Sequence, residues 1–298
     1  MFTTPESSPL LVQAAQGLTD YLLSTGTASR GVVIGYDHRA RGSLCSHRFA
    51  LLTTAALVSR GIPVYLLRGL SCTPLVPFGI LHLGAAAGIM VTASHNPKQD
   101  NGYKVYGGNG SQIISPVDKA IAAAILRNAA PWTTDAAALY STLDVSALEV
   151  ALRERSLVSD PTDATQAAYF SALASRLCFE RSLREAPGGT PLRVAYTAMH
   201  GVGTPFAARS FASFGLPPFD ATPEQCTPDP EFSTVAFPNP GEAVTNERCS
   251  GDPPAHRISD LLCRGGQGCA CARRGDSRPR RSYPDHCERW VARARCSL

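Results

Sequence analysis

Three short apolar runs, each preceded by a segment with helical spacing, constrain how the first hundred residues can fold. The apolar runs cover residues 32–36, 63–67 and 85–91. The segments with helical spacing cover residues 12–23, 44–60 and 73–82. Alternating helices and buried strands favour a parallel sheet that is covered on both faces. We therefore expect an α/β fold, a three-layer α/β/α domain with a largely parallel sheet.

The rest of the chain predicts further elements and a second domain. Strand candidates at 103–106 and 112–114 flank a glycine-rich turn, and 129–163 reads as mixed helix and loop. Helical spacing recurs at 116–127, 164–179 and 205–214, with a new strand at 192–197. Proline and glycine at 185–191 indicate a linker. We expect one domain over 1–185, an incomplete second domain of the same type over 190–240, and a divergent tail over 241–298.

The third apolar run leads into a polar turn, Thr92-Ala93-Ser94-His95-Asn96-Pro97-Lys98. In open α/β sheets, ligands bind beyond the carboxyl ends of the strands, which is where Ser94 would lie. A serine hydroxyl needs a neighbouring base or cation to become nucleophilic, and His95, Lys98 and Lys104 are all close in sequence. The alternative is a polar turn whose serine and asparagine bond to their own backbone.

A second polar loop follows the first apolar run and contains Arg39 and Arg41. The planar guanidinium group matches the oxygens of a phosphate, so these arginines could clamp one. An ordinary solvated loop is the alternative at this position.

The longer string from Gly88 to Tyr106 closely resembles the phosphoserine loop of the phosphohexomutase superfamily, in its phosphoglucomutase and phosphopentomutase branch, which includes glucose-1,6-bisphosphate synthase. The resemblance implies that Ser94 carries a phosphoryl group and exchanges it with a sugar phosphate. It places His95 and Lys104 around that group as catalytic residues, and it implies binding of substrate by Arg39, Asn96 and Lys98. The implied partners are hexose or pentose phosphates and a sugar bisphosphate.

Other stretches continue the likeness over roughly residues 10–240. Gly35, Asp37 and Arg39 match a Gly-x-Asp-x-Arg stretch of the family, with Arg39 as support for the active site. The His200-Gly201-Val202-Gly203 turn and the Asp229–Phe232 segment resemble the start of the family's second domain. We interpret His200 as structural rather than catalytic.

The resemblance stops near Gly241, and the missing motifs bear on activity. The family binds Mg²⁺ through an Asp-x-Asp-x-Asp-Arg loop, which this sequence lacks, so only a phosphoryl oxygen on Ser94 remains as an expected metal ligand. We therefore expect a truncated enzyme that is inactive alone. The alternative is an inactive regulatory isoform that binds sugar phosphate or a full-length relative. A serine hydrolase would more usually show Gly-x-Ser-x-Gly.

Composition restricts the remaining possibilities. Residues 249–298 contain ten arginines, six of the ten cysteines and no lysine. This composition favours disorder or a changed reading frame. A zinc site is the alternative, but the segment has no paired Cys-x-x-Cys units. The net charge of +4 comes from this tail, so the body gives no electrostatic case for nucleic acid. With neither a membrane-length apolar run nor a signal-like amino terminus, we expect a cytoplasmic protein with reduced thiols in its body.

Overall fold

The computed structural model describes residues 7–42, 44–132, 139–177, 192–239 and 269–274. Its helices are α1 (Ser7–Ser24), α2 (Ser46–Val58), α3 (Leu75–Leu83), α4 (Val117–Arg127), α6 (Val145–Arg153), α7 (Thr162–Arg176) and α9 (Gly203–Ser213), with short 3₁₀ turns η1 (Ala28–Arg30) and η2 (Pro223–Gln225). Its strands are β1 (Val32–Tyr36), β2 (Ala40–Arg41), β3 (Leu44–Cys45), β4 (Val64–Leu66), β5 (Ala87–Val91), β6 (Tyr103–Gly107), β7 (Val158–Ser159), β8 (Leu192–Thr197), β9 (Asp220–Ala221) and β10 (Cys269–Arg274).

The first domain is built on a five-stranded sheet in the order β6-β5-β1-β4-β7. Strands β5, β1, β4 and β7 are parallel, and only the edge strand β6 runs antiparallel. Every residue of β1 and β5 is buried, as expected for central strands covered on both faces. The expected α/β fold with a largely parallel sheet is confirmed.

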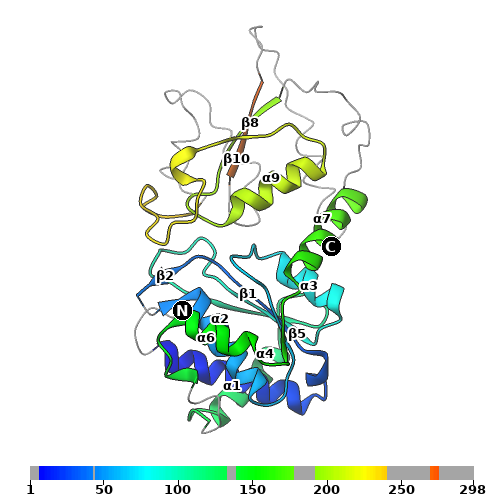
Figure 1. Ribbon diagram of the computed structural model, residues 1–298, viewed down its shortest axis with the longest axis vertical. Coiled ribbons are helices and arrows are strands. Elements are labelled where there is room, and N and C mark those ends of the chain that lie inside the picture. The colour runs from blue at the N-terminus through cyan, green and yellow to red at the C-terminus, as the bar shows by residue number, and fades with distance from the viewer. Residues whose placement is uncertain (1–6, 43, 133–138, 178–191, 240–268, 275–298) are drawn as a thin grey trace.

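Alternate residues of the central strands enter two separate hydrophobic clusters. Val32 and Ile34 pack in the larger cluster with residues of α1 and α2, whereas Val33 packs with residues of α3. Because successive side chains of a strand point to opposite faces, this division defines the three layers. Figure 1 shows these layers in the lower part of the molecule, with α7 leading up to the second domain.

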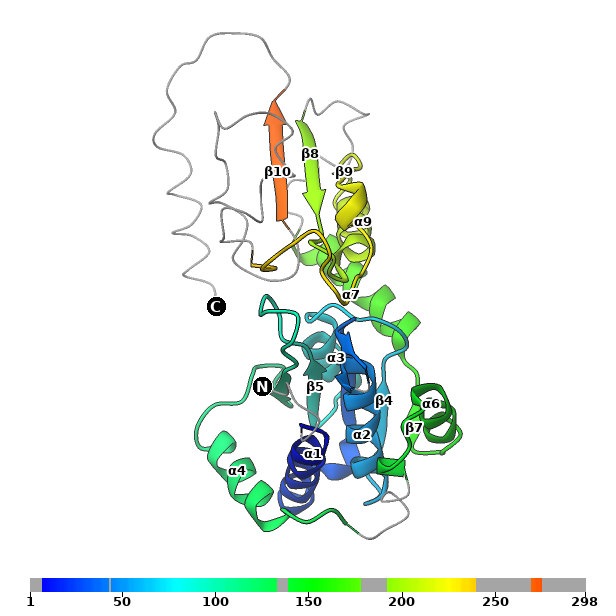
Figure 2. The same ribbon diagram turned by 90° about the vertical axis from the view of Figure 1, so that its left-hand side faces the viewer.

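The second domain contains β8, β9 and α9. Strand β8 pairs in parallel with β9 and antiparallel with β10, and Figure 2 shows β8 and β10 side by side. Helix α9 packs on α7, which also packs on α3, so α7 connects the two parts of the chain. The predicted linker at 185–191 lies outside the described residues, and the predicted domain boundaries stay predictions.

Some predicted elements differ from those found. Helix α1 begins at Ser7 rather than at residue 12, and α7 begins at Thr162 rather than at 164. The predicted strand at 112–114 is reduced to a single bridge between Tyr106 and Gln112, because the chain leaves the sheet there for α4. Strand β7 was not predicted, since its two residues carry no alternating pattern and are defined by pairing with β4.

Strand β10 lies in the segment for which the sequence indicates no regular structure. Its backbone pairs along the whole length of β8. An edge strand offers unpaired N–H and C=O groups to any extended segment, whatever its side-chain pattern, and this explains why periodicity gave no signal. The remainder of 241–298 lies outside the described residues.

Close packing of α3 on the sheet depends on Gly88 in β5. A Cβ atom built on Gly88 would lie 2.8 Å from Cγ1 of Ile80 and 2.8 Å from Cγ1 of Val76, both on α3. We predict that Gly88→Val lowers the free energy of unfolding by about 1–3 kcal/mol, because the added side chain must push α3 from the sheet. Urea unfolding measures this, with Ala123→Val on the exposed face of α4 as the control. Equal stability of the two variants would contradict the packing argument.

Candidate active site

The loop after β5 holds Ser94 in an unusual backbone conformation. Ser94 has φ of 52°, in the left-handed region that residues other than glycine seldom adopt. Its N–H donates to Oγ1 of Thr92 at 3.0 Å, and the N–H of Asn96 donates to the carbonyl of Ala93 at 3.0 Å. These bonds close a tight turn and leave the Ser94 side chain partly exposed beyond the strand end.

Lys104 reaches Ser94 because of the register of the edge strand. It pairs with Met90 in the antiparallel ladder of β5 and β6, and its Nζ donates to Oγ of Ser94 at 2.5 Å. Burial lowers the pKa of Lys104, while the negative charge of Asp37 acts in the opposite direction. A partly buried ammonium group at this distance is able to stabilise negative charge on the serine oxygen.

Arg39 lies beneath the loop and is only 1% exposed. One terminal nitrogen, Nη1, donates to the carbonyls of Pro97 at 2.7 Å and Asp100 at 3.0 Å. The other, Nη2, donates to the carbonyls of Ser94 at 2.9 Å and Asn96 at 2.8 Å. Four carbonyls of the loop therefore converge on one guanidinium group, which supports the loop from inside.

Asp37 fixes the position of this arginine. Its carboxylate accepts from the N–H of Arg39 at 3.1 Å and lies 3.5 Å from Nε of the same residue. The hydroxyl of Ser46, at the start of α2, lies 2.6 Å from Asp37 and 2.8 Å from Oδ1 of Asn101. Asp37, Ser46 and Asn101 are all buried, so a polar network ties the loop to both β1 and α2.

The other predicted site residues lie on the surface of the loop. His95 is exposed directly after Ser94. The side-chain amide of Asn96 donates to Oδ2 of Asp100 at 3.0 Å. The ammonium group of Lys98 is paired with Glu231 of the second domain at 2.7 Å. The structure therefore brings Ser94, Lys104 and Arg39 together, with the remaining three residues around them.

Sequence reasoning missed the contribution of the second domain. The ring of Phe232 lies 5.2 Å from Cζ of Arg39 and 5.1 Å from the ring of His38. Burial lowers the pKa of His38, against the opposing effect of the negative charge on Asp37. The Asp229–Phe232 segment was recognised by resemblance, but its sequence carried no signal of a contact with the serine loop.

The carboxylates of this site do not form a metal cage. Among the described residues, no three His, Cys, Asp or Glu side chains gather as a metal-binding group. Asp37 is engaged with Arg39 and Ser46, and Asp100 accepts from Asn96. The described side chains around Ser94 therefore do not fit the magnesium ion that the family resemblance implies.

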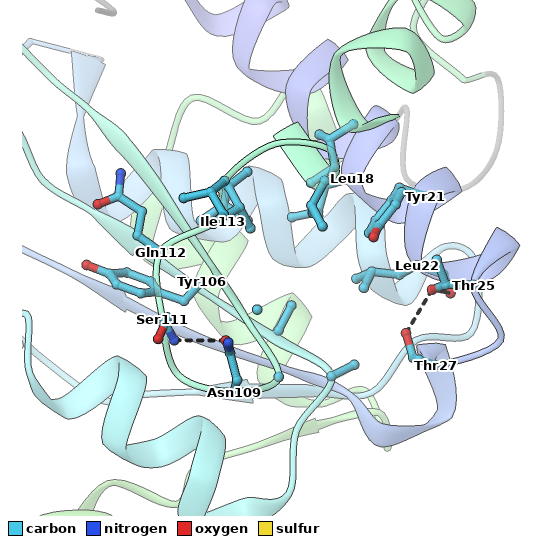
Figure 3. A pocket seen from close by; sticks show the side chains of 18 of the residues that line it. Leu18, Tyr21, Leu22, Thr25, Thr27, Tyr106, Asn109, Ser111, Gln112 and Ile113 are labelled. Carbon is cyan, nitrogen blue, oxygen red and sulfur yellow. Dashed lines mark hydrogen bonds between the residues drawn. The ribbon is translucent and has the colours of Figure 1, made fainter. Parts of the chain in front are cut away.

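A pocket of about 410 Å³ lies away from the serine loop. Leu18, Tyr21 and Leu22 of α1 line it together with the turn after β6, as Figure 3 shows. That turn follows Gly107, which pairs with Ala87 at the beginning of β5, whereas Ser94 follows its end. The pocket and the serine loop are therefore at opposite ends of the sheet.

Among the described residues, no helix combines the length and the apolar character needed to cross a membrane.

Comparisons with known proteins agree with this fold. Residues 4–131 match the phosphoglucomutase/phosphomannomutase alpha/beta/alpha domain I, and residues 155–251 match domain II of the same family. The chain therefore belongs to the phosphoglucomutase/phosphomannomutase family, within the phosphohexomutase superfamily.

The relatives include enzymes of sugar-phosphate metabolism. Phosphopentomutase of Homo sapiens is 44% identical over 237 residues, which cover 78% of this chain and 36% of the relative. Glucose 1,6-bisphosphate synthase of Homo sapiens is 40% identical over 240 residues, with the same coverage. A solved structure of a putative phosphomannomutase from Thermus thermophilus matches with a TM-score of 0.56 and 28% identity, over 76% of this chain and 44% of that one. The chain thus spans little more than a third of the length of these two curated relatives.

The role of Arg39 can be tested against its exposed neighbour Arg41. We predict that Arg39→Lys lowers the free energy of unfolding by about 2–4 kcal/mol, because an ammonium group cannot reach all four carbonyls and buried acceptors lose their partners. Arg41→Lys should change it by less than about 0.5 kcal/mol, as is usual at the surface. Urea unfolding of both variants measures the difference. Similar values for the two would show that the loop does not depend on the guanidinium fork.

The partly buried His38 should make stability depend on pH. The pKa of His38 in the folded chain lies below its ordinary value. At a pH between the folded and the unfolded pKa, the unfolded chain therefore binds a proton at His38 that the folded chain does not. Stability is complete above the unfolded pKa of about 6.5 and is lost as pH falls toward the folded pKa, by at most about 1.4 kcal/mol per pH unit. Urea unfolding from pH 7.5 to pH 5 should show a smaller loss for His38→Gln. Parallel curves would contradict this assignment.

Proposed function

We propose that this chain carries the phosphoserine half of an intramolecular phosphotransferase that acts on sugar phosphates. The observation that supports the proposal best is the contact between Oγ of Ser94 and Nζ of Lys104, in a loop held by Arg39. The phosphopentomutase and glucose 1,6-bisphosphate synthase relatives point to hexose or pentose phosphates, with a sugar bisphosphate as the source of the phosphoryl group. A cytoplasmic location suits this metabolism.

The proposed reaction has two transfers. Phosphorylated Ser94 gives its phosphoryl group to a free hydroxyl of a sugar monophosphate, the hydroxyl proton leaves, and a sugar bisphosphate forms. After the sugar turns, the serine oxygen takes the other phosphoryl group, and the isomeric monophosphate is released with the hydroxyl reprotonated. Such transfers depend on positioning and on stabilisation of charge.

The residues of the loop have distinct proposed roles. Lys104 neutralises charge on the serine oxygen when the phosphoryl group leaves it or arrives. His95 is exposed beside Ser94 and can move the proton of the sugar hydroxyl. Lys98 and Asn96, on the surface of the loop, contribute to binding of the sugar phosphate, and Arg39 contributes by holding the loop rather than through an exposed face. No step is assigned to a magnesium ion, because the described side chains do not fit one.

A second candidate function is an inactive or regulatory form that retains sugar phosphate or binds a longer relative. The observation in its favour is that the 298 residues contain no Asp-x-Asp-x-Asp-Arg motif. We therefore predict no mutase turnover by the 298-residue polypeptide alone with glucose 1-phosphate or ribose 1-phosphate, magnesium and a bisphosphate primer. A coupled assay measures this, and turnover would contradict the need for that motif.

Phosphoryl transfer to Ser94 can be tested in a chimera. Human phosphopentomutase supplies the regions that precede α1 and follow Asn239, and labelled glucose 1,6-bisphosphate supplies the phosphoryl group. We predict label on Ser94, located by mass spectrometry, and its loss in Ser94→Ala, which has no acceptor oxygen. Lys104→Ala should slow labelling on the order of 10²-fold, the usual effect of one electrostatic contact.

The exposed Lys119 of α4 provides the control, since Lys119→Ala removes the same charge away from the loop. It should leave the labelling rate unchanged. A Ser94→Ala chimera that still acquires phosphate on the loop would refute the nucleophile, and an acyl group on Ser94 would favour hydrolase chemistry instead.

A further inference from the structure

A tight turn of the second domain meets the serine loop. Within it, the carboxylate of Asp229 accepts from Oγ of Ser233 at 2.6 Å, from the N–H of Ser233 at 2.9 Å and from the N–H of Glu231 at 2.9 Å. These donors, led by the Ser233 hydroxyl, lower the pKa of Asp229 to about 2. The N–H of Phe232 donates to the carbonyl of Asp229 at 3.0 Å. The turn is therefore rigidly defined by its own bonds.

His200 attaches this turn to the end of β8. Its carbonyl accepts from the N–H of Asp229 at 3.0 Å, and its Nε2 accepts from the N–H of Thr234 at 3.2 Å. Its Nδ1 lies 3.7 Å from Oδ2 of Asp229. His200 is 3% exposed, so it lies inside the second domain. Its hydrogen bonds attach the turn to the segment that follows β8.

The turn presents two side chains to the loop of the first domain. Phe232 is 5% exposed, with its ring against Arg39 and His38. Glu231 is paired with Lys98. Phe232 has φ of 50°, which is costly for a bulky residue and indicates that the position of its ring is strongly determined by its surroundings.

We propose that Phe232 and Glu231 are positioning residues that hold the serine loop in its shape. Phe232 covers the guanidinium group that makes the four bonds to loop carbonyls, and an aromatic face attracts that cation while excluding water from it. Glu231 fixes the loop a second time, at Lys98. The consequence for phosphoryl transfer rests on the proposed function, whereas the effect on loop shape does not.

A contact between α9 and α7 does not involve the serine loop and provides a control. Arg209 of α9 lies with its guanidinium carbon 4.4 Å from the ring of Phe170 and donates to Gln166, both on α7. Arg209→Ala therefore removes an aromatic–arginine contact of the same kind without changing any group that touches the serine loop.

Hydrogen–deuterium exchange of the full chain tests the role of Phe232. We expect Phe232→Ala to lower the protection of peptides spanning 93–101 by about 10-fold. Phe232→Tyr keeps the ring face and should retain protection, and Arg209→Ala should not change it. Peptides from β8 and α9 report in the same experiment whether the second domain stays folded. Unchanged loop protection in Phe232→Ala with a folded second domain would overturn the proposal.

The charged pair gives an independent test on exposed residues, where substitution does not threaten folding. Lys98→Glu or Glu231→Lys alone should lower loop protection on the order of three-fold through repulsion, and the double variant should restore it. Single variants equal to the parent chain, or a double variant without recovery, would overturn the role of Glu231. Because exchange is measured without phosphate, a failure of this inference is distinct from a failure to find phosphate on Ser94.

Discussion

The arrangement of this site depends on one buried cation whose terminal nitrogens donate to the backbone of the serine loop. Arg39 donates to four carbonyls of the serine loop from beneath it. A loop normally satisfies such carbonyls with water, but here a single planar group fixes the path of the chain around itself. This path of the chain places the hydroxyl of Ser94 within hydrogen-bond distance of Lys104.

Burying a guanidinium group is expensive unless its charge is balanced and its donors are satisfied. Asp37 provides the balancing charge from the same strand end, and Ser46 and Asn101 surround that carboxylate with polar groups. Phe232 adds an aromatic face on the side of the second domain. The loop therefore draws on β1, α2 and a segment nearly two hundred residues later in the chain.

The sequence predicted the helices and strands that have a local hydrophobic pattern. The apolar runs became β1, β4 and β5 because burial on both faces requires continuous apolar sequence. Ser94 was placed at a strand end for the same reason. Strands β7 and β10 were missed because backbone pairing with a neighbour, and not side-chain period, determines them.

The sequence indicated which residues lie together within the serine loop, but not which residues far along the chain contact them. Arg39 in a polar loop suggested a phosphate clamp. Nothing in the neighbouring sequence shows that its guanidinium group will instead donate to carbonyls of the serine loop. The partner of Lys98 is 133 positions away, and no spacing rule links them. Contacts of that range are decided by how the two domains pack, which a pattern of single residues does not encode.

Backbone strain in the described part of the chain is gathered where the two domains meet. Its four non-glycine residues with positive φ are Ser94, Met199, His200 and Phe232. Each such conformation costs roughly 1–2 kcal/mol and persists only where surrounding contacts over-determine it. Ser94 belongs to the serine loop, Phe232 belongs to the turn that contacts this loop, and Met199 and His200 lie after β8, where that turn is attached. The hydrogen bonds of Arg39 offset the strain on one side, and those of His200 and Asp229 offset it on the other. The ring of Phe232 lies against the guanidinium group of Arg39. Relaxing the strained backbone at Phe232 would therefore move a side chain that supports the serine loop, and relaxing the loop at Ser94 would move the arginine that supports Phe232.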